Sequence, residues 1–191
     1  MKYEEIEQIV KNTLSPKRYL HSVGVAKRAA QLACIYGEDE EKARKIGIAH
    51  DIAKEMSKEE ALAYAKENHI LFDEIEKEEP SLWHSKLGAD IAVKKFSFTK
   101  DMAEAIIYHT TGSIHMNTMD KIIYVADKSD ETRTKINLEE VVKISNHDLE
   151  EGVLYIAKYM TNYSLQKDSL IHPHTIELIN ELIKEKKNKK Q

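Results

Sequence analysis

The sequence has few of the residues that interrupt helices and almost none that crosslink a chain. Its 191 residues include 6 glycines, 3 prolines and a single cysteine, Cys34. Because glycine and proline are the strongest helix breakers, their scarcity favours long helices over a fold rich in turns. One cysteine excludes an internal disulfide framework and is typical of a reducing compartment, so we expect a cytoplasmic protein.

Long apolar runs and an excess of positive charge are missing as well. No apolar stretch approaches the ~20 residues of a membrane span, and the acidic, amphipathic start MKYEEIEQIVKNTL is no secretory signal. The chain carries 29 Lys and Arg against 33 Asp and Glu, a net charge of −4, which argues against nucleic acid as a partner. The length suits one domain, which we place at residues 1–183, followed by a lysine-rich flexible tail at 184–191.

The hydrophobic residues recur at the helical period along nearly the whole chain, and no segment alternates as a strand does. The third helix, for example, should run from a cap at Asp39 to about Met56, and Ser57 with Glu60 forms a capping box for the next. We therefore predict an all-α protein of one domain. The residues that we expect to start or cap helices are Ser15-Pro16, Asp39, Ser57, Pro80-Ser81, Thr99, Thr118, Asn137, Asn146 and His172-Pro173, and Gly37 should end the second helix.

Nine histidines are present, and several lie in apolar helical segments. His21 and His50 have apolar neighbours, and Asp51 follows His50 directly. Burying a histidine and a carboxylate is costly unless each finds a partner. A divalent metal would provide one, because imidazole and carboxylate are suitable ligands for zinc, iron or manganese.

Neighbouring residues of a helix point about 100° apart, so further ligands would have to come from other helices. The candidates are His84, His109 and Asp127, each in or after an apolar stretch; Asp127 taken alone is also explained as a cap or a core salt bridge. Arg18 and Lys54 lie one turn from proposed ligands, and Arg133 follows in a loop. Cations beside a metal suit a phosphorylated substrate, although solvated surface charges are the alternative.

Other histidines have simpler explanations. The second His-Asp dipeptide, His147-Asp148, lies in a polar stretch before a helix, where capping explains it. His69 is expected at a helix end, His172 at a helix cap, and His115 stays unassigned. The sequence contains no glycine-rich phosphate loop.

Six segments occur in an order that is similar to one known family. They are RYLHSVGVA, AHDIAK, WHSKLGA, HTTG, MDKIIYVAD and LIHPHT. Over roughly residues 17 to 180 the chain resembles the YqeK-type proteins, bacterial symmetrical diadenosine tetraphosphatases of the HD superfamily of metal-dependent phosphohydrolases. The resemblance implies a helical HD-domain bundle that hydrolyses diadenosine tetraphosphate to two ADP. It implies iron as the metal, with manganese or another divalent ion as the alternative, and leaves a homodimer open.

The resemblance also implies residue roles. His21, His50, Asp51 and Asp127 match the core metal ligands, whereas His84 and His109 match histidines that hold a second metal or face the phosphates. Catalysis would then fall to Asp51, His50, His84 and His109. The residues expected to contact the nucleotide are Arg18, His21, Lys54, His84, His109, Thr110, Asp127, Arg133, Leu170, Ile171, His172, Pro173, His174 and Thr175.

One segment departs from the family. Where the family tends to have I-E-P-x-R after the metal aspartate, this chain has Ser129-Asp130-Glu131-Thr132-Arg133, which keeps the arginine and lacks the proline. Two other functions stay open: a broader HD-type nucleotidase acting on mononucleotides or dNTPs, and a non-catalytic HD signalling or binding module. The chain retains every type of metal ligand, which argues against the non-catalytic module.

Overall fold

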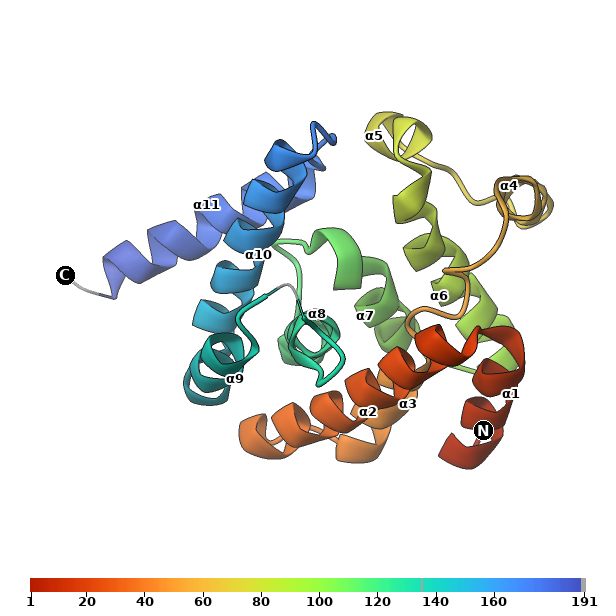
Figure 1. Cartoon of the computed structure of the whole chain (residues 1–191), viewed down its shortest axis with the longest axis horizontal. Helices are drawn as coiled ribbons and strands as arrows, with labels where there is room; N and C mark the ends of the chain where they lie inside the picture. Colours follow the sequence, from red (N-terminus) through yellow and green to blue (C-terminus); the bar gives the residue numbers. More distant parts are fainter. Residues whose placement is uncertain (135, 190–191) are drawn as a thin grey trace.

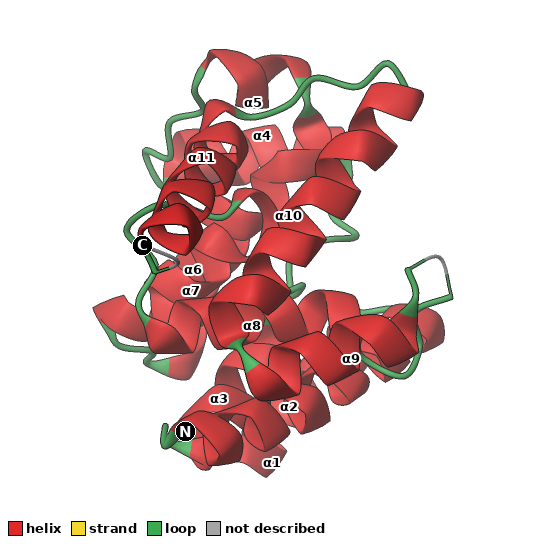
Figure 2. Ribbon diagram, turned by 90° about the vertical axis from the view of Figure 1, so that its left-hand side faces the viewer, coloured by secondary structure: helices red, strands yellow, loops and turns green. Residues whose placement is uncertain are grey.

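The computed structural model describes residues 1–134 and 136–189, and every regular element in them is a helix (Figure 2). This confirms the predicted all-α class. The elements are α1 (Tyr3–Thr13), α2 (Pro16–Tyr36), α3 (Glu40–Ala49), α4 (Lys58–Glu67), α5 (Glu74–Glu78), the 3-10 helix η1 (Pro80–Leu82), α6 (Trp83–Phe96), α7 (Lys100–Thr111), α8 (Thr118–Ser129), α9 (Leu138–His147), α10 (Leu149–Gln166) and α11 (Pro173–Asn188).

Several helix ends are fixed by the capping residues that the sequence predicts. The Ser15 hydroxyl accepts a hydrogen bond from the Arg18 amide at 3.4 Å. Gly37 ends α2 with φ of 71°, a left-handed conformation that glycine adopts without steric cost. Ser57 and Glu60 form the predicted capping box of α4. These local hydrogen bonds satisfy amides that no preceding turn of the helix can satisfy.

Three boundaries differ from the predictions. The third helix ends at Ala49, because the residues that follow form turns closed by i→i+3 hydrogen bonds. In one of them, Ile52 N donates to Ala49 O at 3.0 Å. Asn146 lies inside α9, and Asp148 caps α10 instead. Helix α8 begins at Thr118, as predicted, and Asn117 is its N-cap. Helix α11 continues through Asn188, into the segment expected as a tail, of which residues 190–191 lie outside the described residues.

The helices pack around α7 and α8, which lie near the middle of the molecule (Figure 1). Helix α2 lies along α3 and also against α8, and α7 contacts both α6 and α8. Gly47 permits the close approach of α3 to α2, since a Cβ there would lie 2.8 Å from the Ala26 Cα. Buried apolar side chains from these helices and from α10 form the main core, and burying each of them contributes roughly 1.5–3 kcal/mol. Its largest members include Leu32, Ile46, Ile106, Ile122 and Ile156.

A smaller apolar cluster packs α4 and the segment before α5 on α6. Trp83 stacks on Phe72 with ring centroids 4.7 Å apart, and its indole N–H donates to Glu76 O at 2.6 Å. This packing fixes the segment from α5 to η1, which forms one wall of the site described below. No helix among the described residues has the length and apolar character needed to cross a membrane.

Candidate active site and metal centre

Four helices and one turn bring the predicted ligands to a single buried centre. His21 comes from α2, His109 from α7 and Asp127 from α8, while His50 and Asp51 occupy the tight turn that follows α3. His84 comes from the first turn of α6. All six side chains are at most 5% exposed, so the early end of α3 matters: it lets two adjacent residues face the same centre.

Backbone carbonyls fix the orientation of three of the imidazole rings. The Nδ1 atoms of His50, His84 and His109 lie 2.7, 2.8 and 2.6 Å from the carbonyl oxygens of Gly47, Ser81 and Ile106. A carbonyl only accepts, so each Nδ1 carries the proton and each Nε2 presents a lone pair to the centre.

A carboxylate orients the fourth ring. His21 Nδ1 lies 3.1 Å from Asp130 Oδ2, and His21 Nε2 lies 3.0 Å from Asp127 Oδ1. Gly24, one turn along α2, makes room for Asp130, because a Cβ there would lie 2.9 Å from Asp130 Oδ1. Carboxylate support of this kind raises the basicity of a metal-binding histidine.

The Asp51 carboxylate lies between two pairs of histidines. Its Oδ2 is 3.5 Å from His50 Nε2 and 3.8 Å from His21 Nε2. Its Oδ1 is 3.4 Å from His84 Nε2 and 3.6 Å from His109 Nε2. The six side chains therefore contain overlapping donor sets, of which His21, His50 and Asp127 form one and His50, Asp51 and His109 another.

This donor set fits a divalent cation. Among the described residues, His50 Nε2 is buried without a hydrogen-bond partner, an arrangement that is costly unless a cation takes up its lone pair. His84 Nε2 and His109 Nε2 lie 3.1 Å apart, so two lone pairs face each other. Burial, followed by Lys54, holds the pKa of His84 well below its usual range, so protonation does not relieve this contact. Imidazole nitrogens with carboxylate oxygens are the ligands that iron, manganese and zinc accept.

The two central aspartates are negatively charged. Burial alone would raise the pKa of Asp51, but His50, His109 and His84 together hold it well below its usual range. Burial opposes ionisation of Asp127 too, and the neighbouring Lys128 and Arg133 outweigh it. Two anions buried this deeply require cations around them.

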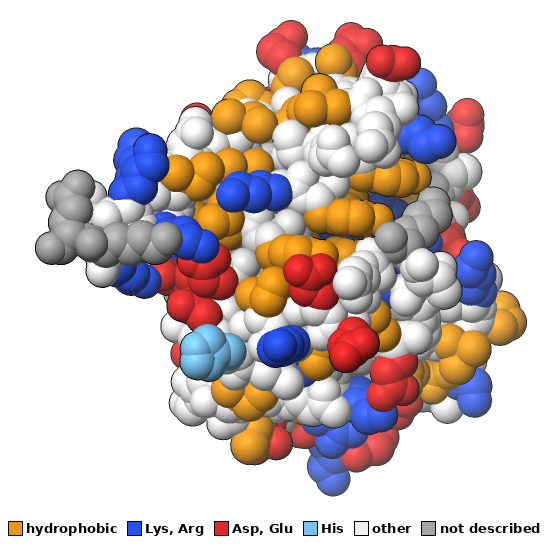
Figure 3. Space-filling view, turned by 60° about the vertical axis from the view of Figure 1, so that its left-hand side comes forward, with side chains coloured by type: hydrophobic (Ala, Val, Ile, Leu, Met, Phe, Trp, Pro, Cys, Tyr) orange, Lys and Arg blue, Asp and Glu red, His pale blue; other side chains and the backbone are white. Residues whose placement is uncertain are grey.

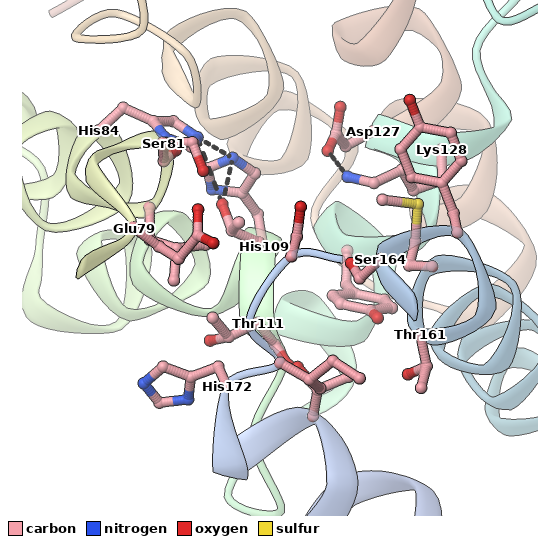
Figure 4. A pocket seen from close by; sticks show the side chains of 18 of the residues that line it. Glu79, Ser81, His84, His109, Thr111, Asp127, Lys128, Thr161, Ser164 and His172 are labelled. Atoms are coloured by element: carbon pink, nitrogen blue, oxygen red, sulfur yellow. Dashed lines mark hydrogen bonds and ion pairs between the residues drawn. The ribbon is translucent and has the colours of Figure 1, made fainter. Parts of the chain in front are cut away.

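A cavity of about 380 Å³ opens from this centre and is lined by cations on its inner side. Arg18 Nη1 lies 2.8 Å from Asp51 Oδ2, and Lys54 Nζ lies 3.3 Å from His84 Nε2. Arg133 and Lys128 both contact the Asp127 carboxylate. In Figure 4, His84 and His109 lie on one side of this cavity and Asp127 with Lys128 on the opposite side.

The outer wall of the cavity comes from α10 and from the segment before α11. Leu170 N donates to Glu79 Oε1 at 3.1 Å, and His172 Nε2 lies 2.8 Å from Asp73 Oδ2. His172 is also the N-cap of α11, as expected. These contacts join the start of α11 to the α5–η1 segment across the cavity.

The structure brings most of the expected nucleotide contacts to this cavity. Arg18, Lys54, Thr110 and Arg133 line it. Of the expected segment before α11, the lining includes Leu170, Ile171, His172 and Thr175, whereas Pro173 and His174 are exposed and are not part of the wall.

Sequence reasoning missed several side chains of the site. Asp130 could have been found, because it follows Asp127 by three residues and shares its helix face. The Asp130 carboxylate also accepts hydrogen bonds from the Thr132 amide, at 2.9 Å, and hydroxyl, so it stiffens the loop that lacks the family's proline. No sequence signal marked Lys128. Tyr124, Met160 and Tyr163 complete the lining and carry only the apolar periodicity of their helices.

A helical fold around a buried His/Asp centre defines a class, the HD domain, and residues 18–132 match the model of that family. The symmetrical bis(5'-nucleosyl)-tetraphosphatase of Bacillus subtilis is 34% identical over 187 residues, which are 96% of this chain and 98% of that protein. The enzyme of the same name from Halalkalibacterium halodurans is 32% identical, covering 94% of this chain and 96% of that protein.

A solved structure leads to the same HD class. A crystal structure from Clostridium acetobutylicum, described as an HD superfamily hydrolase involved in NAD metabolism, superposes with a TM-score of 0.91 at 33% identity. The match covers 97% of this chain and 98% of that one. The chain therefore belongs to the HD-domain family and, within it, to the symmetrical bis(5'-nucleosyl)-tetraphosphatases, which confirms the resemblance seen in its six segments.

Proposed function

We propose that this protein hydrolyses diadenosine tetraphosphate symmetrically to two ADP. The observation that carries the proposal is the position of the Asp51 carboxylate, which lies between two pairs of histidines at the base of a cation-lined cavity. The relatives named for this activity match nearly the whole chain. A cation-lined cavity suits a polyphosphate, because Arg and Lys bind phosphate oxygens through charge-assisted hydrogen bonds.

The metal would be held by His21, His50, Asp51 and Asp127, with His84 and His109 available for a second ion or for the phosphates. A divalent ion bound there supplies Lewis acidity, which lowers the pKa of water and offsets phosphate charge. We propose iron as the physiological ion, as the family resemblance implies, with manganese or another divalent ion as the alternative. Mixed imidazole and carboxylate donors accept each of these ions.

In the proposed reaction, water attacks an inner phosphorus of the tetraphosphate. The bond from that phosphorus to the central bridging oxygen breaks, and the bridging oxygen leaves as a terminal oxygen of the second ADP. Arg18, Lys54 and Arg133 neutralise the charge that develops on the leaving group. Asp51 or His109 receives the proton of the water, since both face the centre. Cleavage at the middle of a symmetrical chain makes the two products identical.

Product analysis tests the reaction. With metal-loaded protein and diadenosine tetraphosphate, we expect chromatography to show ADP as the product, at two per substrate consumed. ATP with AMP would contradict symmetrical cleavage. Faster turnover of dNTPs or mononucleotides would favour the broader nucleotidase, and no turnover of any phosphoester would favour the binding module.

Metal dependence tests the cofactor. A chelator should abolish turnover, and ferrous iron or manganese added back should restore it. Activity that survives removal of the metal, verified by elemental analysis, would contradict the proposal.

Two further expectations stay predictions. The first is a homodimer, which light scattering can test, and the second is a cytoplasmic location.

A further inference from the structure

A second cavity, of about 510 Å³, adjoins the active-site cavity. Both volumes fall in the range of small-molecule sites, about 300–1,000 Å³. The same side chains line part of both cavities and so form a ridge between them. They are Arg18, Lys128, Arg133, Met160 and Tyr163.

The ridge lies directly beside the metal ligands. Arg18 contacts Asp51 at 2.8 Å, and Lys128 and Arg133 both contact Asp127. Three cations thus stand between the two cavities and next to the centre that performs the chemistry. A polyphosphate chain that crosses this ridge would have its middle beside the metal and its two ends in different cavities.

The second cavity has the surface that a nucleobase requires. Tyr159 and Tyr163, four residues apart on one face of α10, line it with Met160, and Ile136 lines it from the segment before α9. On the face of the molecule in Figure 3, hydrophobic side chains gather in a band over α10. Aromatic rings bind bases of any sequence by stacking on their π-faces.

We propose that the second cavity binds the second nucleoside of the dinucleotide, while the active-site cavity binds the first. This inference rests on the proposed function and extends it, because it assigns the recognition of the far nucleoside to a surface on α10. Binding both ends on either side of the ridge places the central bond of the tetraphosphate at the metal centre. Tyr159 is the most informative residue, since it lines the second cavity and is not part of the first.

A substrate pair isolates the second nucleoside. Adenosine 5'-tetraphosphate carries the same phosphate chain as diadenosine tetraphosphate and lacks one adenosine. In Tyr159→Leu, loss of one stacking surface should lower the ratio of kcat/KM for the dinucleotide to kcat/KM for the mononucleotide by about tenfold. Tyr159→Phe keeps the ring and should keep the wild-type ratio.

The matched control lies one turn earlier on the same helix. Tyr155 is also half-buried and donates a hydrogen bond to Glu140 at 2.9 Å, and it lines neither cavity. Tyr155→Leu should therefore leave the substrate ratio unchanged. A ratio that stays at the wild-type value in Tyr159→Leu, with folding verified by circular dichroism, would overturn the assignment of the second cavity.

A binding measurement tests the same inference without relying on a variant. Calorimetric titration of the metal-loaded wild-type protein with ADP, the product, should show two bound ADP molecules per chain. In Tyr159→Leu, the affinity of only one of these two binding sites should fall. One ADP per chain in the wild type would contradict a second nucleoside site. If the wild type releases ADP from the dinucleotide and yet binds one ADP, the second cavity alone is wrong; if it does not cleave the dinucleotide, the proposed function fails and the inference falls with it.

Discussion

Two His-Asp dipeptides occur in this chain, and only one of them lies in the buried His/Asp centre. His50-Asp51 lies in the tight turn after α3, where both side chains are buried among the candidate ligands from α2, α6, α7 and α8. His147-Asp148 lies at the junction of α9 and α10, where His147 is exposed and Asp148 accepts a hydrogen bond from the Glu151 amide at 3.0 Å.

The difference shows that the surroundings of a His-Asp dipeptide decide whether it becomes a candidate metal site. At the α9–α10 junction one helix amide satisfies the aspartate, and no buried charge has to be compensated. In the centre, His50 and Asp51 are buried where backbone amides cannot satisfy them, so other helices must supply their partners. Two of the following experiments use a residue of the second dipeptide as the control for a residue of the buried centre.

The largest effect is expected from Asp51→Asn. An amide in place of the carboxylate removes a negative charge from between four imidazole rings, so activity on diadenosine tetraphosphate should fall at least about 100-fold, more than losses of supporting residues usually cause. Asp148→Asn is the matched control, because asparagine caps helices as well as aspartate does. It should keep wild-type activity and melting temperature. Near-normal activity of the folded Asp51→Asn variant would contradict the role of Asp51 as a core metal ligand.

A smaller effect is expected from Asp130→Asn, which weakens the support of the His21 ring. Metal affinity should fall about tenfold, the lower end of the range for residues that orient a ligand. Metal-binding titrations give this number directly, and activity should recover when more metal is added. If excess metal fails to restore activity, Asp130 does more than orient His21.

The smallest effect concerns pH and is expected in the metal-free protein. Burial lowers the pKa of both His84 and His109 in the folded state, whereas the ordinary value is 6.5. At these two histidines the unfolded chain therefore binds more protons below pH 6.5, so their contribution should lower the free energy of unfolding as the pH falls through that value. His84→Gln should flatten this decrease in urea denaturation between pH 8 and 5.5, and exposed His147→Gln should leave it unaltered. If the free energy of unfolding of His84→Gln depends on pH as steeply as that of the wild type, the His84 ring does not cause the decrease.

Much of the fold could be predicted because helix ends depend on nearby residues. Ser15, Gly37 and the Ser57–Glu60 capping box act within one turn, so their roles follow from spacing alone. The predictions were wrong where two local signals compete, as at Asn146, which α9 takes up while Asp148 caps the next helix. The end of α3 at Ala49 was also missed, because local helix propensity continues beyond it.

Less of the site could be predicted. Their apolar helical context marked its histidines and two of its aspartates, and the family resemblance added their roles. Lys128 and the side chains of α10 belong to the site only because the helices pack as they do. Asp130 reaches His21 across more than 100 residues of sequence, through the space that Gly24 leaves. No spacing rule relates residues so far apart.

The sequence by itself determined the helical class, the positions of most helix starts and the residue types available for metal and phosphate binding. These follow from periodicity, capping and side-chain chemistry, which act over a few residues. The tertiary structure decided which His-Asp pair is buried, which nitrogen of each ring faces the centre, and that two cavities flank it. Burial and packing set these features, because they depend on contacts between helices that are distant in the chain.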